Sequence, residues 1–554
     1  MSDSAKPEDG KTDGTVVATE RDRRRAANIQ DPPSGMTRIV RQTGPGLIIA
    51  ASIVGSGELI MTTKTGASAG IALLWLILLG CMVKVFVQLE LGRFTISSGE
   101  STLTALNRVP GPRTRRINWV VSLWAIMALA TVGQLGGIVG GVSEAVAVTF
   151  PIYGDYQKAV RIPSAQNIVN YVELQSADPD SDRLAWVRSD LDQLSDRERK
   201  ALLDQAALVV AASDVDSRNE QLTRLEDLTT RDTWDNRIWS IVIGVFTAVI
   251  LFVGRYRLIE NLSVVLVVAF TFITIGNVIA LQWTSYAIDT SDILRGLSFG
   301  LPESSDAIRT ALATFGIIGV GAAELVMYPY WCLEKGYARY VGPKDDSDEW
   351  LSRASGWIRV MKYDAFASMV IYTLSTAAFF LMGAAVLHAD GRNPDNHRLV
   401  STLAESYRPV FGDYGRLLLL AGAVAVLYST YMVANASNAR VFADFTGVIG
   451  LSDSRMESKQ RQFLVGLLSF CLPLACVVVY LVVEAPVLLI MVAGTCQSLM
   501  LPVLGFGSLY LRYRETDSRL SPGLLWDLAL IASCLGMLIA GSWGVYKATV
   551  DLFS

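Results

Sequence analysis

The stretch 44–63 reads "GPGLIIAASIVGSGELIMTT" and is the first strongly apolar segment of the chain. Its length matches the roughly 20 residues that a helix needs to cross a bilayer. Gly55 and Gly57 weaken a helix at its middle, and Glu58 adds an ionisable side chain that is costly to bury there. Backbone groups freed by an interruption must line a protein-enclosed cavity. The stretch therefore predicts an interrupted membrane helix at a functional site.

Further apolar segments follow along the whole chain. Of its 554 residues, 51% are hydrophobic and 18% are charged, and the mean hydropathy is +0.37. This composition predicts an all-α integral membrane protein with about eleven spans. The spans are expected near 45–63, 71–92, 118–147, 236–253, 260–282, 308–331, 362–386, 415–437, 462–483, 485–510 and 523–547.

Charge predicts how the chain is oriented and divided. The basic loops "RVPGPRTRR" (108–116), "EKGYARYVGPK" (334–344) and "RYRETDSR" (512–519) fall on the side of the N-terminus, which is therefore expected to be cytoplasmic in an inner or plasma membrane. The polar stretch between spans three and four is expected to form an extracytoplasmic helical insertion, whose role as a shield or as a regulatory domain stays open. The predicted parts are a disordered tail (1–36), spans one to three (37–149), the insertion (150–235) and spans four to eleven (236–554).

The reactive residue types exclude several classes of protein. The six cysteines lie in or beside apolar segments without CxxC spacing, and the two histidines, His388 and His397, share one predicted loop. These patterns predict neither a disulfide framework nor a zinc site or histidine relay within the membrane. With no nucleophile–base pair and no phosphate loop, we expect no enzyme activity, no cofactor and no nucleic-acid partner. The oligomeric state stays open.

A second interruption is predicted in the sixth span, "ALATFGIIGVGAAELVMYPYW" (311–331), where three glycines precede Glu324 and Pro329. Each half of the chain thus interrupts its first helix beside one Glu, which is typical of an inverted repeat of five plus five spans with one extra helix. Carboxylates and freed carbonyls suit Mg²⁺, Mn²⁺ or Ca²⁺, so Glu58 and Glu324 are candidate metal ligands. In the alternative, the glycines serve only close packing and Glu58 pairs with Lys64 or Lys84.

The stretch "GPGLIIAASIVGSGELIMTTKTGASAGIALLW" (44–75) resembles the first helix and following turn of the Nramp divalent-metal transporters, which have the LeuT-type fold. The segments 428–445 and 489–503 resemble that family's eighth and tenth helices. The family's Asp-Pro-Gly-Asn signature corresponds here to Gly55-Ser56-Gly57-Glu58. The resemblance therefore implies a substrate site at these four residues, with the Asp ligand replaced by Gly55 and the Asn ligand by Glu58.

In the sixth helix the family has an Ala whose carbonyl binds metal, followed by Met-Pro-His. The resemblance implies Ala323 for the carbonyl and, anchored on Pro329, puts Tyr328 at the Met position and Tyr330 at the His position. Met327 lies one residue away. Gln134 and Gly137 stand where third-helix carboxylates serve proton movement. The resemblance thus implies Ala323, Met327 and Tyr328 as binding residues and Tyr330 and Gln134 as candidates along the pathway. Glu324 and Lys84 join these two groups, respectively, because they are ionisable residues within spans.

These observations predict a secondary transporter that moves inorganic divalent cations, Mg²⁺ or Mn²⁺, across a lipid bilayer by alternating access. Because the histidine and the third-helix carboxylates are replaced, proton coupling of the usual family type is not expected. One alternative keeps the fold and takes an amino acid or amine, whose ammonium Glu58 or Glu324 would bind. Another is a membrane sensor that does not transport, with a partner bound to the insertion.

Overall fold

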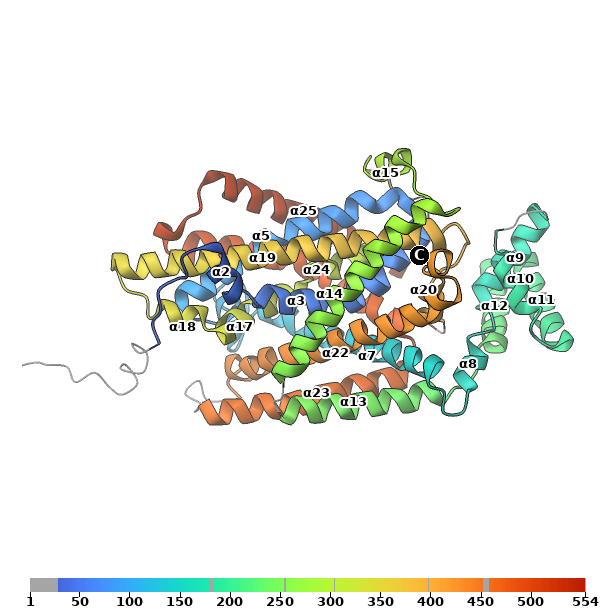
Figure 1. The fold of residues 1–554 in the computed structure, drawn as a ribbon, viewed down its shortest axis with the longest axis horizontal. Coiled ribbons are helices and arrows are strands. Elements are labelled where there is room, and N and C mark those ends of the chain that lie inside the picture. The colour runs from blue at the N-terminus through green and yellow to red at the C-terminus, as the bar shows by residue number, and fades with distance from the viewer. Residues whose placement is uncertain are drawn as a thin grey trace, which may run out of the picture.

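The chain folds into one bundle of long helices that run side by side along a common axis (Figure 1). The computed structural model describes residues 28–553 apart from 180–182, 254–255, 303, 397 and 452–457. The predicted tail 1–36 therefore lies outside the described residues up to residue 27. Within the described part, the only strands are β1 (Arg113–Thr114) and β2 (Ile117–Asn118), an antiparallel pair. The all-α prediction is confirmed.

Nine helical runs among the described residues are long and apolar enough to cross a membrane. One of them, Gly57–Ser98, holds the end of the first predicted span and all of the second, and a shorter apolar helix, Val267–Trp283, lies in the fifth. Eleven predicted spans are thereby accounted for. They are α3 (Pro45–Ile53) to α4 (Thr63–Ala69), α5 (Leu74–Ser98), α7 (Trp119–Thr149), α13 (Asp235–Val253), α14 (Tyr256–Ala280), α16 (Ser305–Ile317) with α17 (Ala322–Lys335), α19 (Asp348–Met382), α22 (Asp413–Val448), α23 (Ser458–Val483), α24 (Pro486–Tyr510) and α25 (Leu524–Phe553).

Short elements connect the spans. They are α2 (Met36–Gln42), η2 (Gly70–Leu73), α6 (Thr102–Leu106), η3 (Leu281–Trp283), α15 (Thr290–Gly296), α18 (Tyr337–Val341), η4 (Gly383–Leu387), α20 (Leu399–Glu405), α21 (Arg408–Phe411), η5 (Leu511–Glu515) and η6 (Ser518–Leu520). Of these, α2 and α18 lie at one end of the bundle and α15 and α20 at the other (Figure 1).

The discontinuity predicted in the first span takes the form of a π-helix, η1 (Val54–Thr62), between α3 and α4. The wider π turn leaves the α register without unwinding the chain. Two glycines weaken the α-helix here, and the Thr62 hydroxyl donates a hydrogen bond of 2.8 Å to the carbonyl of Gly57. The carbonyl of Gly57 is thus satisfied from within the segment.

The sixth span is broken outright. Its first half, α16, ends at Ile317, Ile318 is extended with ψ 153°, and α17 begins only at Ala322. Gly319 has a φ of 56°, in the left-handed region that glycine adopts without a steric penalty. The break therefore follows directly from the glycine-rich approach that the sequence shows.

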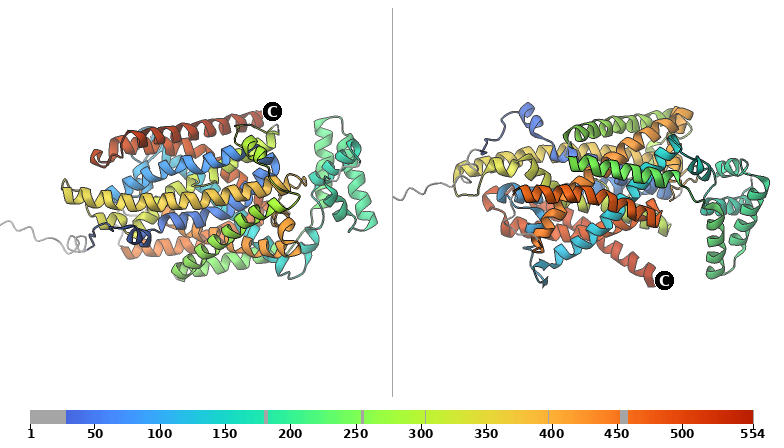
Figure 2. Two further views of the ribbon diagram at one scale, coloured as in Figure 1. Left: turned by 45° about the horizontal axis from the view of Figure 1, so that its top comes forward. Right: turned by 90° about the horizontal axis from the view of Figure 1, so that it is seen from below.

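The insertion between α7 and α13 forms a cluster of helices beyond one end of the bundle, as both further views also show (Figure 2). Its own hydrophobic core includes Ile168, Val187 and Leu202. Its two ends are fastened by reciprocal contacts, because Asp235 accepts from the backbone of Tyr153 and Asp155 accepts from the backbone of Trp234. The helices are α8 (Asp155–Ala159), α9 (Ala165–Ala177), α10 (Ala185–Leu191), α11 (Asp196–Ala211) and α12 (Val215–Thr229).

Candidate functional site

The two interrupted helices touch at the level of their interruptions. A Cβ atom added to Gly57 would lie 2.9 Å from the carbonyl oxygen of Ile317, the last residue of α16. Only a residue without a side chain permits this approach. The structure therefore brings together the two glycine-containing segments that lie five spans apart in the sequence.

Lys84 of α5 binds the broken end of α16. Its ammonium group donates to the carbonyl oxygen of Phe315 and, at 2.8 Å, to that of Ile318. Carbonyls at the C-terminal end of a helix have no partner within the helix and carry partial negative charge. Lys84 is fully buried and interacts electrostatically with Glu324. A positive charge thus already occupies the carbonyl end of the interruption.

Glu58 points toward the seventh span. Its Oε1 atom lies 2.9 Å from the hydroxyl of Thr376, and its Oε2 atom is buried without a hydrogen-bond donor in good geometry among the described residues. Lys64 instead donates to Asn393 and to the carbonyl of Pro394. No salt bridge joins Glu58 to Lys64 or Lys84 in the described part of the chain, so the pairing alternative is not observed. One oxygen of a buried carboxylate is left for a proton or a cation.

Glu324 and Ala323 lie in the first turn of α17, where the partial positive charge of the helix N-terminus favours a carboxylate. The side-chain oxygen of Gln497 accepts from the backbone N–H of Ala323 at 3.1 Å. The amide nitrogen of Gln497 donates to the side-chain oxygen of Gln134 at 2.7 Å. Amide side chains from spans three and ten are therefore linked to the start of α17.

Met327, and not Tyr328, shares a cavity with Ala323. The cavity has a volume of about 10 Å³, room for about one water molecule, and is lined from α7, α17 and α22. Tyr328 does not line this cavity, and its buried hydroxyl lies 3.5 Å from the carbonyl of Met361. The alignment anchored on Pro329 would have put Tyr328 at the Met position. The structure instead supplies a thioether beside the Ala323 turn.

Tyr330 lies away from this cavity. Its hydroxyl donates to Asp444 of α22 at 2.6 Å, and the hydroxyl of Ser101 donates to the same carboxylate at 2.5 Å. The bond ties α17 to α22 beyond the interruption. This contact places no Tyr330 hydroxyl beside Glu58.

Gly55 faces α22 at very close range. Its backbone N–H donates to the Thr430 hydroxyl at 3.0 Å, and an added Cβ would lie 2.5 Å from that oxygen. An Asp at this position, as in the family signature, would need the space that Thr430 fills. The side chain of Ser56 lies outside the part of the chain that the structure describes.

Several polar partners were not predicted from the sequence. Thr376, Thr430 and Gln497 are single polar residues in apolar segments, a weak signal that only tertiary contacts convert into a site. Glu144 of α7 is also buried, with one carboxylate oxygen unpaired in the described residues. Because burial of a carboxylate within a span is costly, Glu144 carries the same sequence signal as Glu58.

The candidate donors are oxygens and one sulfur drawn from several helices, and the cavity beside Ala323 and Met327 is lined by neither Glu58 nor Glu324. Among the described residues, no group of three or more His, Cys, Asp or Glu side chains is arranged to hold a metal. Binding of a cation would therefore depend on Glu58, Glu324, backbone carbonyls and Met327 in combination.

The buried carboxylates, the interrupted sixth helix and the membrane-length spans define a multi-pass α-helical membrane protein with a polar site at its core. Comparison with known families gives a narrower assignment. The family model described as natural resistance-associated macrophage protein-like, Nramp, matches residues 228–546, more than half of the chain. The chain belongs to the Nramp family. The stretch 44–75 lies outside the matched residues.

Individual relatives are more distant. The chain is 29% identical to the metal transporter Nramp2 of Oryza sativa subsp. japonica over 127 residues, 22% of this chain and 23% of that protein. It is 28% identical to the divalent metal cation transporter MntH of Verminephrobacter eiseniae over 131 residues, 24% of this chain and 30% of that protein. The matches thus span less than a third of either relative.

Two solved structures resemble the whole chain at low similarity. A manganese transporter of Eremococcus coleocola is 15% identical, with a TM-score of 0.47, over 93% of this chain and 97% of that one. Mhp1, a nucleobase-cation-symport-1 family transporter, is 12% identical, with a TM-score of 0.46, over 91% of this chain and 93% of that one.

Proposed function

We propose that this protein is a secondary transporter that moves a divalent inorganic cation across the membrane by alternating access. The observation that carries the proposal is the contact of Lys84 with the carbonyls of Phe315 and Ile318 at the break in the sixth span. These carbonyls lie within a membrane span and bind a positive group. Family membership and the two metal-transporting relatives support the same substrate class.

The ion would be held where the two interruptions meet. Glu58 offers a buried oxygen that has no hydrogen bond of good geometry among the described residues. Glu324, the carbonyls near Gly55 and Ala323, and the thioether of Met327 complete the candidate set. Ser56 and Gly57 form the adjoining backbone. Thioether sulfur binds transition metals better than hard ions, so a ligand at Met327 would favour Mn²⁺ over Mg²⁺, whereas the carboxylate and carbonyl oxygens suit both ions.

Transport is proposed to occur without the proton coupling that is usual in the family. Gln134 occupies the third-span position at which a carboxylate would move protons, and its side chain is engaged by Gln497. An amide does not titrate and cannot relay a proton as a carboxylate does. The N-terminus is proposed to be cytoplasmic and the insertion extracytoplasmic, because the basic loops favour that orientation.

The test is uptake of Mg²⁺, Mn²⁺ and Ca²⁺ into proteoliposomes that contain an internal pH dye. We expect Mn²⁺ and Mg²⁺ entry without acidification, and a reduction of at least about tenfold for Glu58→Gln, since an amide cannot replace the charge of a carboxylate ligand. Glu349→Gln, at an exposed residue near the start of α19, is the control and should transport normally.

Two results would count against the proposal. Folded wild-type protein that admits none of the three metals would contradict it, and competition by amines would then favour an organic substrate. Metal entry that is equal in Glu58→Gln and the wild type would remove Glu58 from the site. Acidification that accompanies entry would overturn the uncoupled mechanism alone.

A further inference from the structure

A cleft of about 700 Å³ opens at the end of the bundle that carries the insertion. It lies between the insertion, the segment 388–411 and the start of α22. The side chains that line it include five arginines and two carboxylates. These charged residues are Arg161, Arg392, Arg398, Arg408 and Arg416, with Asp190 and Glu405. The lining therefore has an excess of positive charge, which Asp390 beside Arg392 and Asp395 beside Arg398 reduce without removing.

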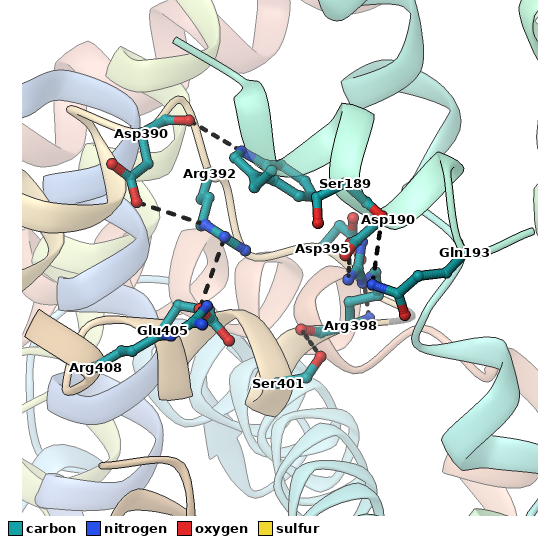
Figure 3. A network of polar contacts seen from close by, with 11 residues as sticks. Ser189, Asp190, Gln193, Asp390, Arg392, Asp395, Arg398, Ser401, Glu405 and Arg408 are labelled. Carbon is teal, nitrogen blue, oxygen red and sulfur yellow. Dashed lines mark hydrogen bonds and ion pairs between the residues drawn. The ribbon is translucent and has the colours of Figure 1, made fainter. Parts of the chain in front are cut away.

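Two of the arginines are built into the wall. Arg392 and Arg398 are 13% and 12% exposed, and Trp186 of the insertion packs against both, with its ring 4.4 Å and 5.5 Å from the two guanidinium carbons. Figure 3 shows Arg392 between Asp390 and Glu405, and Arg398 beside Asp190. The stacking holds both planar groups in fixed orientations.

These buried guanidinium groups keep unused donors. Arg398 donates to Asp190 at 2.9 Å, but its Nε and Nη1 atoms are buried without an acceptor in the described residues. Arg392 forms ion pairs of 3.7 Å with both Asp390 and Glu405, beyond hydrogen-bond distance, and its Nε has no hydrogen-bond acceptor among the described residues. Burial, together with the charge of Arg398, lowers the pKa of Arg392 even though Glu405 and Asp390 act to raise it. Buried donors without acceptors are costly and point to a missing acceptor.

The remaining arginines approach from the solvent side. Arg161 and Arg416 are exposed, and within the described residues neither side chain makes a hydrogen bond or ion pair. Arg408 is 62% exposed and lies 3.5 Å from Glu405. Positive groups therefore surround the cleft from several sides, with donors left over on most of them.

We infer that this cleft binds a phosphate-bearing anion. Two N–H groups of one guanidinium can bind two oxygens of the same phosphate. Donors that converge from several segments suit a phosphate, which has acceptors on every side, better than a single carboxylate. Apolar side chains of Val148, Val160, Leu417 and Leu420 line the cleft as well, which leaves room for an organic group attached to the phosphate. Inorganic phosphate and an anionic phospholipid headgroup share this chemistry. The inference does not depend on the transported ion.

The experiment uses the full chain, delipidated in neutral detergent, with all samples at one ionic strength so that general screening is constant. Inorganic phosphate binding is measured by calorimetry. In parallel, the thermal midpoint is compared between nanodiscs of phosphatidylcholine alone and nanodiscs that also contain phosphatidylglycerol. The test variant is Arg161→Gln with Arg416→Gln, because neither side chain contributes to docking of the insertion. Arg218→Gln with Arg224→Gln is the matched control on the exposed face of the insertion.

The expected result is binding of at least one probe by the wild type and the control. The double variant should bind about tenfold more weakly, since charge-assisted contacts are each worth roughly a tenfold factor or more. Arg392→Gln should bind more weakly still. Calorimetric binding would identify free phosphate, and a midpoint shift confined to phosphatidylglycerol would identify a lipid. Absence of both, or equal binding by the double variant and the control, would overturn the inference; this comparison holds even if Arg392→Gln fails to fold.

Discussion

At the scale of the single residue, Lys84 connects the second span to the break in the sixth. Its buried ammonium group donates to two carbonyls at the end of a broken helix. The charge and the broken helix therefore stabilise each other. A buried ammonium in an apolar span, which is unfavourable alone, becomes part of the architecture of the sixth span.

Replacement of that side chain should destabilise the fold. Lys84→Met keeps the length and removes the donors, so the carbonyls of Phe315 and Ile318 lose their partner at a cost of about 1–3 kcal/mol each. We expect a markedly lower thermal midpoint in detergent. Lys158→Met, at an exposed residue of α8, is the control. A midpoint equal to that of the wild type would show that water or another group satisfies the carbonyls.

Gly55 permits a second prediction at this scale. In Gly55→Ala the added Cβ would lie 2.5 Å from the Thr430 hydroxyl, and overpacking of this kind costs about 1–3 kcal/mol. Gly133→Ala places its Cβ at an ordinary 3.6 Å from Leu489 and should melt like the wild type. The thermal midpoints of the two variants decide the matter, and equal midpoints would contradict the close packing of η1 on α22.

The charged members of the candidate site were predictable, because burial of a charge in a span is costly and hence conspicuous. Glu58, Lys84 and Glu324 all carry this signal. Their partners do not, since a Thr or Gln in an apolar helix has many harmless positions. The one-residue choice between Met327 and Tyr328 also needed the structure, because Pro329 fixes the register only if the glycine-rich approach has the family's length.

At the scale of the element, α3 begins on a carboxylate borrowed from another span. Asp364 of α19 accepts from the backbone N–H groups of Gly44 and Gly46 at 2.9 and 2.6 Å. The leading Gly-Pro-Gly is explained by this contact, because a Cβ on Gly46 would lie 2.8 Å from the Asp364 carbonyl. A negative charge at a helix N-terminus is favourable, and here it joins spans one and seven.

Loss of this contact should loosen the start of α3. Asp364→Ala removes both acceptors, and each charge-assisted bond is worth about 1.5–3 kcal/mol. We expect faster amide hydrogen exchange in residues 44–48 and a lower thermal midpoint. Asp364→Asn retains one acceptor and should show a smaller effect of the same sign. Unchanged exchange in the Ala variant would mean that the helix start is held by other groups.

Both interruptions were predictable as elements, but their forms were not. Glycines at 55, 57, 316, 319 and 321 show where an α-helix is weak. They do not show whether the chain widens into a π turn, as in η1, or opens, as between α16 and α17. That choice depends on what the freed groups meet: Thr62 within η1, and Lys84 beside α16.

At the scale of the whole molecule, the insertion is attached to the bundle at two places. One is the pair of chain connections beside Asp155 and Asp235, and the other is the contact of α10 with the segment after η4. The indole N–H of Trp186 donates to the carbonyl of Asp390 at 3.0 Å, and Asp190 pairs with Arg398. The insertion is docked and is not merely tethered.

Trp186→Ala should undock it. The substitution removes the bond to Asp390 and the stacking on Arg392 and Arg398, while the core of the insertion around Ile168 stays intact. We expect faster limited proteolysis of the two connections with an unchanged thermal midpoint of the bundle. Trp283→Ala, at a side chain that is 80% exposed, is the control. Equal cleavage in both variants would contradict docking through Trp186.

Hydropathy predicted the spans well, since a bilayer demands long apolar segments and few alternatives exist. Helical spacing predicted the helices of the insertion. The docking was not predictable, because Trp186, Arg392 and Arg398 are separated in sequence and are ordinary surface residue types. The positive-inside rule uses the basic loops of one side of the membrane, so it gives no reason to expect a site at the arginines of 392–416 on the other side.

The segment 388–394 contacts both α4 and the insertion. Both ends of the segment contact α4. Lys64 donates to Asn393 and to the carbonyl of Pro394, and the Nδ1 atom of His388 lies 2.9 Å from the carbonyl of Ala67. Between these contacts, Arg392 packs against Trp186 of the insertion. Since α4 continues directly from η1, this short segment connects the insertion to the helix turn that carries Glu58.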